Sequence, residues 1–315
     1  MIVCGIDEAG YGPLLGPLCV ALSVFRVDGW SPGDPAPDLW ELLSSAVARE
    51  PNDAKGRLPV ADSKRLKLSN SLKTKHPLTH LERSVLAFAR TLDWRPADDD
   101  ELFEHLGAEP EPHPWYAGST LLPLSTTHDR VGIEASRLRR AMKSSGVELL
   151  ELRCAFVGEQ AFNDTVARTH SKAETTIGAV GSHLRRVRER WGGEEVRVIC
   201  DRLGGRLGYG ELIGRAFGDR FETLEQSARA SRYRAGLIGV TFMPEAEDAH
   251  LPVALASMVA KLVRELAMTR FNAYWTGRMP GLRRTAGYRQ DAKRWLGDAE
   301  GVIGDQERAT MVRLA

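Results

Sequence analysis

The stretch from Ile2 to Leu18, IVCGIDEAGYGPLLGPL, constrains the fold of this chain more than any other. It opens with the continuous apolar run IVCGI, which is typical of a strand covered on both faces of a sheet. Asp7 and Glu8 follow that run directly, and a glycine-rich loop comes next. A carboxylate at the end of a buried strand is costly unless a divalent cation or another partner compensates it. The stretch therefore predicts a functional strand end, although a turn or helix cap stays open as the alternative for any one acid.

Composition limits the classes of protein that need to be considered. The 315 residues are enough for one large domain or two ordinary ones, and 43% of them are apolar. The net charge of +1 excludes a basic field over the whole surface, so any nucleic-acid contact must be a local patch. Neither a signal peptide nor an apolar run of membrane-spanning length is visible. The four cysteines form no Cys-x-x-Cys pair. Cys4 and Cys200 lie in apolar, strand-like runs, where buried free thiols are expected, and this favours a cytoplasmic location.

Periodicity predicts strands and helices in alternation through most of the chain. Helices are expected over residues 38–50, 82–92, 130–146, 173–193 and 251–275, and strands over 1–6, 17–27, 147–157, 195–201, 220–227 and 235–247. Residues 93–124 are rich in proline and turn residues and are expected to form a loop-rich excursion. This order indicates a mixed α/β sheet with helices packed on its faces.

Two further acids stand out by their position. Asp201 directly follows the apolar run VRVIC, so it repeats the arrangement of Asp7 at a second strand end. Glu265 lies in the apolar helical segment MVAKLVRELAM, at the edge of a buried stripe. For Glu265 alone, an ordinary ion pair or a solvated side chain is the simpler interpretation.

Five segments of the chain, in order, resemble the type 2 ribonucleases H, the ribonuclease HII and HIII family. GIDEAGYGPLLGPL resembles the family signature DEAGRGP-x-x-GP, and the other four segments are VADSKRLKLS, VRVICDRLGG, LPVALASMVAKLVREL and RTAGYRQDAKRW. The resemblance implies a ribonuclease H-like α/β fold with a mixed five-stranded sheet flanked by helices, in a single domain over 1–315. Residues of about 71–149 are then an insertion, and about 270–315 a C-terminal helical segment that binds substrate.

The resemblance also implies a catalytic site made of four acids. They are Asp7, Glu8, Asp201 and Glu265, which would be the catalytic residues and also the ligands of two Mg²⁺ or Mn²⁺ ions. The implied activity is endonucleolytic hydrolysis of the RNA strand of RNA–DNA hybrids, or of ribonucleotides embedded in duplex DNA, leaving a 5′-phosphate. The implied partner is therefore nucleic acid, and neither a membrane nor a protein partner is expected.

Substrate contacts are implied for a second group of residues. They are Gly10, Tyr11 and Gly12 in the loop, Ser63 and Lys64 in the second segment, and Tyr288 in the last. The family has Arg or Lys at the position of Tyr11, so this loop lacks the usual positive charge. A basic run near Tyr288 is expected to grip a duplex backbone, or else to be a solvated face; it contains Arg283, Arg284, Arg289, Lys293 and Arg294.

The altered loop leaves a second class of function open, a nucleic-acid-binding protein of the same fold that is catalytically retired or re-targeted. Three other features are expected to be structural. The acidic run from Asp98 to Glu101 is typical of a helix start. Pro77 argues against a helical metal pair of His76 and His80. The segment with Trp115 and Tyr116 is expected to pack on the core rather than to stack on bases.

Overall fold

The computed structural model describes residues 1–31, 33–51, 55–70 and 72–314. Positions 71 and 315, which fall in the expected insertion and C-terminal segment, lie outside the described residues. The strands are β1 (Ile2–Ala9), β2 (Leu18–Val27), β3 (Val47–Ala48), β4 (Leu58–Pro59), β5 (Val147–Val157), β6 (Val196–Asp201), β7 (Glu222–Gln226), β8 (Ser231–Ala235) and β9 (Ile238–Met243). The α-helices are α1 (Leu39–Leu42), α2 (Ser63–Leu66), α3 (Thr79–Thr91), α4 (Asp99–Leu106), α5 (His128–Ser144), α6 (Glu159–Thr169), α7 (Ala173–Trp191), α8 (Gly210–Phe217), α9 (Ala246–Ala249), α10 (Leu251–Arg278), α11 (Arg289–Asp298) and α12 (Asp305–Met311), and a 3₁₀ turn, η1, covers Pro114–Tyr116.

The main sheet is mixed, in the strand order β5-β2-β1-β6-β9-β8-β7. β1 pairs antiparallel with β2 and parallel with β6, and β6 pairs parallel with β9. The expected mixed α/β sheet is confirmed, but it has seven strands in the described chain where the resemblance implied five. The antiparallel strands β8 and β7 extend it beyond β9. β8 was not expected, because arginines alternate with buried Ser231 and Tyr233 and weaken its apolar pattern.

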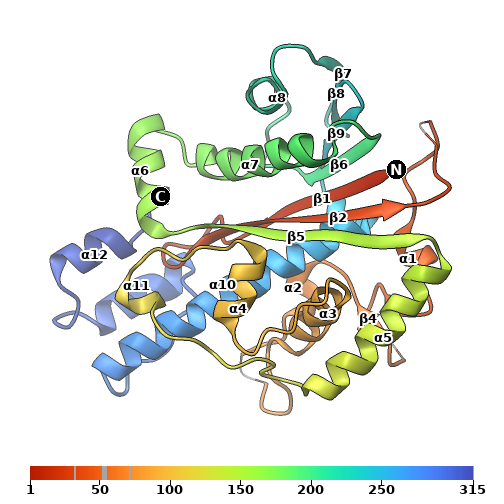
Figure 1. Ribbon diagram of the computed structural model, residues 1–315. Coiled ribbons are helices and arrows are strands. Elements are labelled where there is room, and N and C mark those ends of the chain that lie inside the picture. The colour runs from red at the N-terminus through yellow and green to blue at the C-terminus, as the bar shows by residue number, and fades with distance from the viewer. Residues whose placement is uncertain (32, 52–54, 71, 315) are drawn as a thin grey trace.

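Helices cover the two faces of the sheet, as Figure 1 shows with α6 and α7 on one side and α10 with α3 and α5 on the other. Alternate residues of β1 serve the two cores: Ile2, Cys4 and Ile6 pack toward α7, and Val3 packs toward α10. A Cβ at Gly5 would lie 2.1 Å from the carbonyl carbon of Pro252. Glycine at this position therefore lets the N-terminal turn of α10 lie directly on β1.

The region of the expected insertion forms a packed helical layer rather than a loose excursion. Phe88 of α3 meets Phe25 of β2 edge to face, with ring centroids 6.2 Å apart. Asp98 caps α4 by accepting from the N–H of Glu101 at 3.0 Å, as expected for a helix start. Trp115 is 3% exposed and packs against the second half of α10, so the predicted packing role is confirmed.

The prediction of a helix over 38–50 is wrong beyond the first turn. α1 ends at Leu42, and Val47–Ala48 forms a short parallel pair with Leu58–Pro59. The carbonyl of Val60 also accepts from the indole N–H of Trp40, so tertiary contacts override the local helical periodicity.

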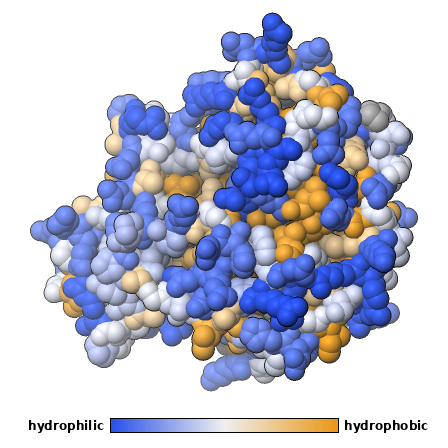
Figure 2. Space-filling model, in the orientation of Figure 1, coloured by the Kyte–Doolittle hydropathy of each residue, from blue (hydrophilic) through white to orange (hydrophobic). Residues whose placement is uncertain are grey.

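The surface contains little contiguous apolar area on the side seen in Figure 2. There, hydrophilic side chains predominate, and apolar ones gather mainly in one patch over the band of strands of Figure 1. Within the described residues, even the 28-residue α10 lacks the combination of length and apolarity needed to cross a bilayer. The cysteines Cys4, Cys19, Cys154 and Cys200 are buried free thiols, which the sequence predicted for Cys4 and Cys200.

Candidate active site

Three of the predicted acids come together at one edge of the main sheet. Asp7 and Glu8 lie near the end of β1, and Asp201 is the last residue of β6. Because β1 and β6 are parallel neighbours, their carboxyl ends meet at the same edge. Asp7 lies on the face toward α10, where the hydroxyl of Ser257 is its hydrogen-bond partner. The two strands therefore bring Asp7, Glu8 and Asp201 together rigidly.

A fourth acid, Glu247, joins them and was not predicted. It lies in α9, which follows β9, the parallel neighbour of β6. The N–H of Ala246 donates to Oδ1 of Asp201 at 3.2 Å, and this contact fixes the start of α9 against the strand end. Glu247 is 8% exposed, and its Oε2 is buried without a hydrogen-bond partner among the described residues. A third strand end thus contributes its own carboxylate to the same edge.

The pKa values of these acids show the cost of gathering them. Burial, and then the carboxylate of Glu8, raises the pKa of Asp7 well above its ordinary value. Burial, and then Asp201, raises the pKa of Glu8 to about 7. Burial and then Asp201 likewise raise the pKa of Glu247 to about 7. Burial also raises the pKa of Asp201, against the N–H donated by Ala246. A cluster of four carboxyl groups whose pKa values are all raised is typical of a functional site.

Glu265 is not part of this cluster. Its contacts are with two lysines: Lys261 lies 2.9 Å away, one helical turn back on α10, and Lys67 lies 3.8 Å away, just after α2. The physical reason is distance along the helix, since Glu265 follows Ser257 by eight residues, or about 12 Å of helix axis. Ser257 is the residue that stands beside Asp7. Glu265 therefore forms an ordinary ion pair, which was the simpler of the two interpretations of its sequence position.

Ser63 and Lys64 begin α2 near the acids, and the structure separates their roles. Ser63 is 3% exposed and its hydroxyl accepts from Ser257 at 2.9 Å, so it supports the partner of Asp7 rather than facing solvent. Lys64 is exposed. Partial burial works to lower the pKa of Lys64, but the carboxylates of Asp62, Glu247 and Asp7 outweigh it and raise that pKa. Lys64 is thus the cation that faces the acidic cluster.

The glycine loop from Gly10 to Gly16 is held by two buried arginines. Arg313 donates to the carbonyls of Gly10 at 2.6 Å and Tyr11 at 3.1 Å. Arg264 donates to the carbonyls of Leu15 at 3.2 Å and Ala286 at 3.1 Å. Gly10 has φ +97°, and a Cβ there would lie 2.6 Å from Nε of Arg264. The glycine is therefore required both by its backbone conformation and by the close approach of the arginine.

The segment of Tyr288 is joined to the same loop. The carbonyl of Gly287 accepts from the N–H groups of Leu14 at 2.8 Å and Leu15 at 3.2 Å. Tyr288 is 48% exposed, and its ring lies 5.7 Å from the guanidinium carbon of Arg264. Tyr11 is 39% exposed. The structure therefore brings the loop and Tyr288 together, with both rings accessible.

The expected basic run is only partly available to a ligand. Arg294 donates to Asp291 at 2.6 Å and to Asp298 at 2.8 Å, so its charge is already paired on α11. Arg289, the first residue of α11, is exposed. The run therefore offers fewer free cations than the sequence suggested.

The chemistry of the acidic cluster fits a divalent metal ion, because carboxylate oxygens are the ligands that Mg²⁺ and Mn²⁺ prefer. The unpartnered buried Oε2 of Glu247 and the raised pKa values of its neighbours point the same way. As the side chains stand in the described residues, no three His, Cys, Asp or Glu groups are close enough to hold a metal ion. The acids therefore supply the type of ligand that the ion prefers, but their side chains as they stand do not form a complete metal site.

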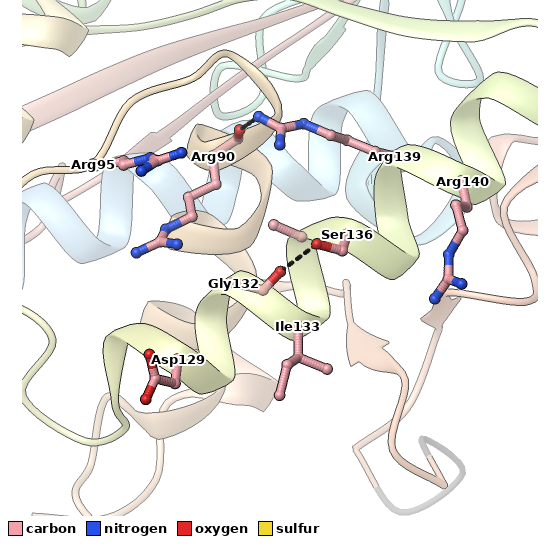
Figure 3. A pocket seen from close by; sticks show the side chains of 9 residues that line it. Arg90, Arg95, Asp129, Gly132, Ile133, Ser136, Arg139 and Arg140 are labelled. Atoms are coloured by element: carbon pink, nitrogen blue, oxygen red, sulfur yellow. Dashed lines mark hydrogen bonds between the residues drawn. The ribbon is translucent and has the colours of Figure 1, made fainter.

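A cavity of about 570 Å³ between α3 and α5 lies apart from this cluster, and none of the four acids lines it. Figure 3 shows Arg90, Arg95, Arg139 and Arg140 around it, together with Asp129. The guanidinium of Arg139 is already bonded to the carbonyl of Arg90 and the carboxylate of Asp93. The cavity therefore has mixed charge and no part in the candidate active site.

Comparison with known proteins points to one group of structures. No protein-family model matches the chain, and no curated protein matches it. The chain is similar to ribonuclease H2 from Pyrococcus horikoshii, with 17% identity and a TM-score of 0.48 over 99% of this chain and 92% of that one. It is similar to ribonuclease HII of Archaeoglobus fulgidus, solved in complex with PCNA, with 14% identity and a TM-score of 0.44 over 100% and 94%. It is also similar to Bst ribonuclease HIII in complex with Mn²⁺, with 14% identity and a TM-score of 0.44 over 100% and 66%.

These structures are ribonucleases HII and HIII, the proteins that the sequence motifs resemble. At identities of 14 to 17% and TM-scores of 0.44 to 0.48, the likeness carries neither a fold assignment nor an activity across to this chain.

Proposed function

We propose that this protein is a divalent-metal-dependent endonuclease that hydrolyses the RNA strand of RNA–DNA hybrids or ribonucleotides embedded in duplex DNA. The observation that carries the proposal is the cluster of Asp7, Glu8, Asp201 and Glu247 at the carboxyl ends of three parallel strands. A cluster of acids this poorly ionised is costly for a fold unless it has a task. The glycine loop beside it supports a substrate with a closely approaching backbone.

Asp7, Glu8, Asp201 and Glu247 would hold Mg²⁺ or Mn²⁺ in a two-metal site. When bound, such ions make a water nucleophilic and relieve the leaving oxygen of its developing charge. The raised pKa values mean that these carboxyl groups give up protons on binding, so occupancy should increase with pH. Glu265 takes no part in this set, since its carboxylate is paired with Lys261 and Lys67.

The remaining residues of the site would handle the nucleic acid. Lys64, exposed beside the acids, would contact a phosphate next to the bond that is cut. Gly10 and Gly12 would let the strand approach the loop, and Tyr11 would offer one hydroxyl donor and an aromatic face. Tyr288 would pack on the sugar or base at the other side of the loop. The product would have a 5′-phosphate and a 3′-hydroxyl, and the buried free thiols support a cytoplasmic location.

Cleavage of three labelled duplexes in Mg²⁺ and in Mn²⁺ tests the proposal. One is an RNA–DNA hybrid, one is DNA with a single ribonucleotide, and one is all DNA. The expected result is cutting of a ribonucleotide-containing duplex that is abolished in Asp7→Asn. Cutting of the all-DNA duplex at an equal rate would refute the selectivity for ribonucleotides, and cutting that survives Asp7→Asn would refute the site.

A nucleic-acid-binding protein without catalysis is the second candidate. The observation that favours it is Tyr11, which stands where the family resemblance implies Arg or Lys, so the loop lacks that positive charge. Metal titration separates the two candidates. A catalytic site predicts that Mn²⁺ raises the midpoint of unfolding and that Asp201→Asn removes this effect. A binding protein predicts intact duplex affinity and no response to the metal.

A further inference from the structure

Lys172 lies against the glycine loop although it follows Tyr11 by 161 residues in sequence. It is the residue before α7, in the connection that follows the left-handed His170 at the end of α6. Its Nζ lies 5.0 Å from the ring centroid of Tyr11 and 6.0 Å from that of Phe162. An ammonium at these distances is attracted to the negative faces of the rings, which holds the side chain over the loop.

The surroundings of Lys172 are cationic. The guanidinium of Arg313 lies 3.8 Å from the ring centroid of Phe162, so Lys172 and Arg313 share this ring. Partial burial, followed by the charges of Arg313 and Arg289, lowers the pKa of Lys172. Among the described residues, Lys172 has no ion pair with a carboxylate. Arg313 also feels the buried carboxylate of Glu159.

That carboxylate does not neutralise the group. Oε1 of Glu159 accepts from the hydroxyl of Tyr116 at 2.8 Å and from the N–H of Gly16 at 3.0 Å. Burial raises the pKa of Glu159 to about 7, so it is a weak counter-charge near neutrality. Like charges gathered without a neutralising acid favour an anion from outside the protein.

Two helix starts add to the same field. Lys172 precedes the 19-residue α7, and Arg289 begins the 10-residue α11. Neither helix has a side-chain hydrogen bond capping its N-terminus. Each first turn also carries an acid, Glu174 in α7 and Asp291 in α11, so the helix dipoles add only modestly to the two side-chain charges, which are the main attraction for an anion.

We propose that Lys172, with Arg289 and the hydroxyl of Tyr11, binds a backbone phosphate of the substrate strand beside the glycine loop. The ammonium of Lys172 serves as a point charge for the phosphate, and the Tyr11 ring under it fixes its position. Arg313 does not contact the phosphate, because its guanidinium is engaged with the carbonyls of the loop. The inference rests on the proposed function for the identity of the ligand as a nucleic-acid strand.

Salt-dependent binding of a duplex tests the site. The protein carries Asp7→Asn to prevent cutting, and the probe is a fluorescent DNA duplex with a single ribonucleotide. Lys172→Met should reduce the magnitude of the slope of log affinity against log salt by roughly 0.7 to 0.9, the value expected for the loss of one phosphate contact. It should also weaken binding about tenfold. Arg190→Met is the matched control, because Arg190 is an exposed cation at the other end of α7, about 27 Å away along the helix. Lys172→Arg should keep the slope.

Equal slopes for Lys172→Met and Arg190→Met would overturn the site. An affinity lost without a change of slope would also overturn it, since Lys172 would then only support Tyr11. Cleavage by the protein with Asp7 intact is measured separately. A slope change at Lys172 in a protein that cuts nothing would support the phosphate site and refute the nuclease. Cleavage of the duplex together with equal slopes for the two variants would support the nuclease and refute the phosphate site.

Discussion

Replacing Glu247 by Gln should stabilise the metal-free protein and abolish its metal-dependent cleavage. Glu247 is 8% exposed, its Oε2 has no hydrogen-bond partner among the described residues, and it faces Asp201. Glutamine keeps the shape of the side chain but removes the charge. The variant therefore relieves the repulsion in the cluster while it removes one metal ligand.

The size of the gain follows from the raised pKa. A pKa of about 7 in place of 4.5 means that ionised Glu247 is less favourable in the folded than in the unfolded chain. At about 1.4 kcal/mol per unit, this amounts to roughly 3 kcal/mol at pH 8. Solvent at the edge of the cluster screens part of it, so we expect a gain of about 1–2 kcal/mol.

Urea unfolding in EDTA measures this gain, and Glu265→Gln is the control. The gain of Glu247→Gln should be present at pH 8 and shrink as the pH falls toward about 4, where the carboxyl is protonated in both states. Glu265→Gln breaks the pairs with Lys261 and Lys67, so it should lose about 0.5–1 kcal/mol and keep its cleavage. The reasoning would be refuted if the two variants exchanged these behaviours, or if Glu247→Gln still cut in Mn²⁺.

Two further perturbations test the fold and the electrostatics. Asp99→Asn should lower the free energy of unfolding in urea by about 3 kcal/mol, because it leaves the charge of Arg270 without its buried partner. Asp100 contacts the same arginine but is 60% exposed, so Asp100→Asn should lower it by less than about 1 kcal/mol. Equal losses in the two variants would contradict the buried pair. The metal-free protein should also become less stable as the pH rises from about 4.5 to 8, because Glu8 and Glu247 bind protons more tightly in the folded state. Mn²⁺ should oppose this decline. A urea midpoint that rises over this pH range in EDTA would contradict the raised pKa values.

The strands of the site could be predicted because their signals are local. Continuous apolar runs identified β1 and β6, and the acids that follow each run were visible in the sequence. Their convergence was expected only from the family resemblance, and the parallel pairing of β1 and β6 that produces it is seen in the fold. Arginines occupy alternate positions of β8, so of the two strands beyond β9 only the edge strand β7 was expected.

The fourth acid could not be chosen correctly from local patterns. Three acids, Glu245, Glu247 and Asp248, stand between β9 and α10, and the sequence does not say which one faces inward. The backbone decides it, since Glu245 has φ 53° and the turn that follows directs α9 toward Asp201. The spacing of Lys261 and Glu265, four apart on one helix, was the available signal that Glu265 was paired elsewhere.

The contacts that hold the glycine loop were also beyond prediction. Arg264, next to Glu265 on α10, is 0% exposed and bonds to two separate loops. No periodicity identifies a buried arginine whose partners are backbone carbonyls far away in sequence. Such contacts depend on the whole fold.

The bond between Arg313 and Gly10 joins positions that are 303 residues apart. A ribosome makes Gly10 early and Arg313 much later, so the loop acquires its support only after nearly all of the described chain has been synthesised. Strand β1 and its acids can pair long before that moment. A growing chain would therefore pass through a stage in which the acids are present but the loop beside them lacks the contacts that Arg313 makes.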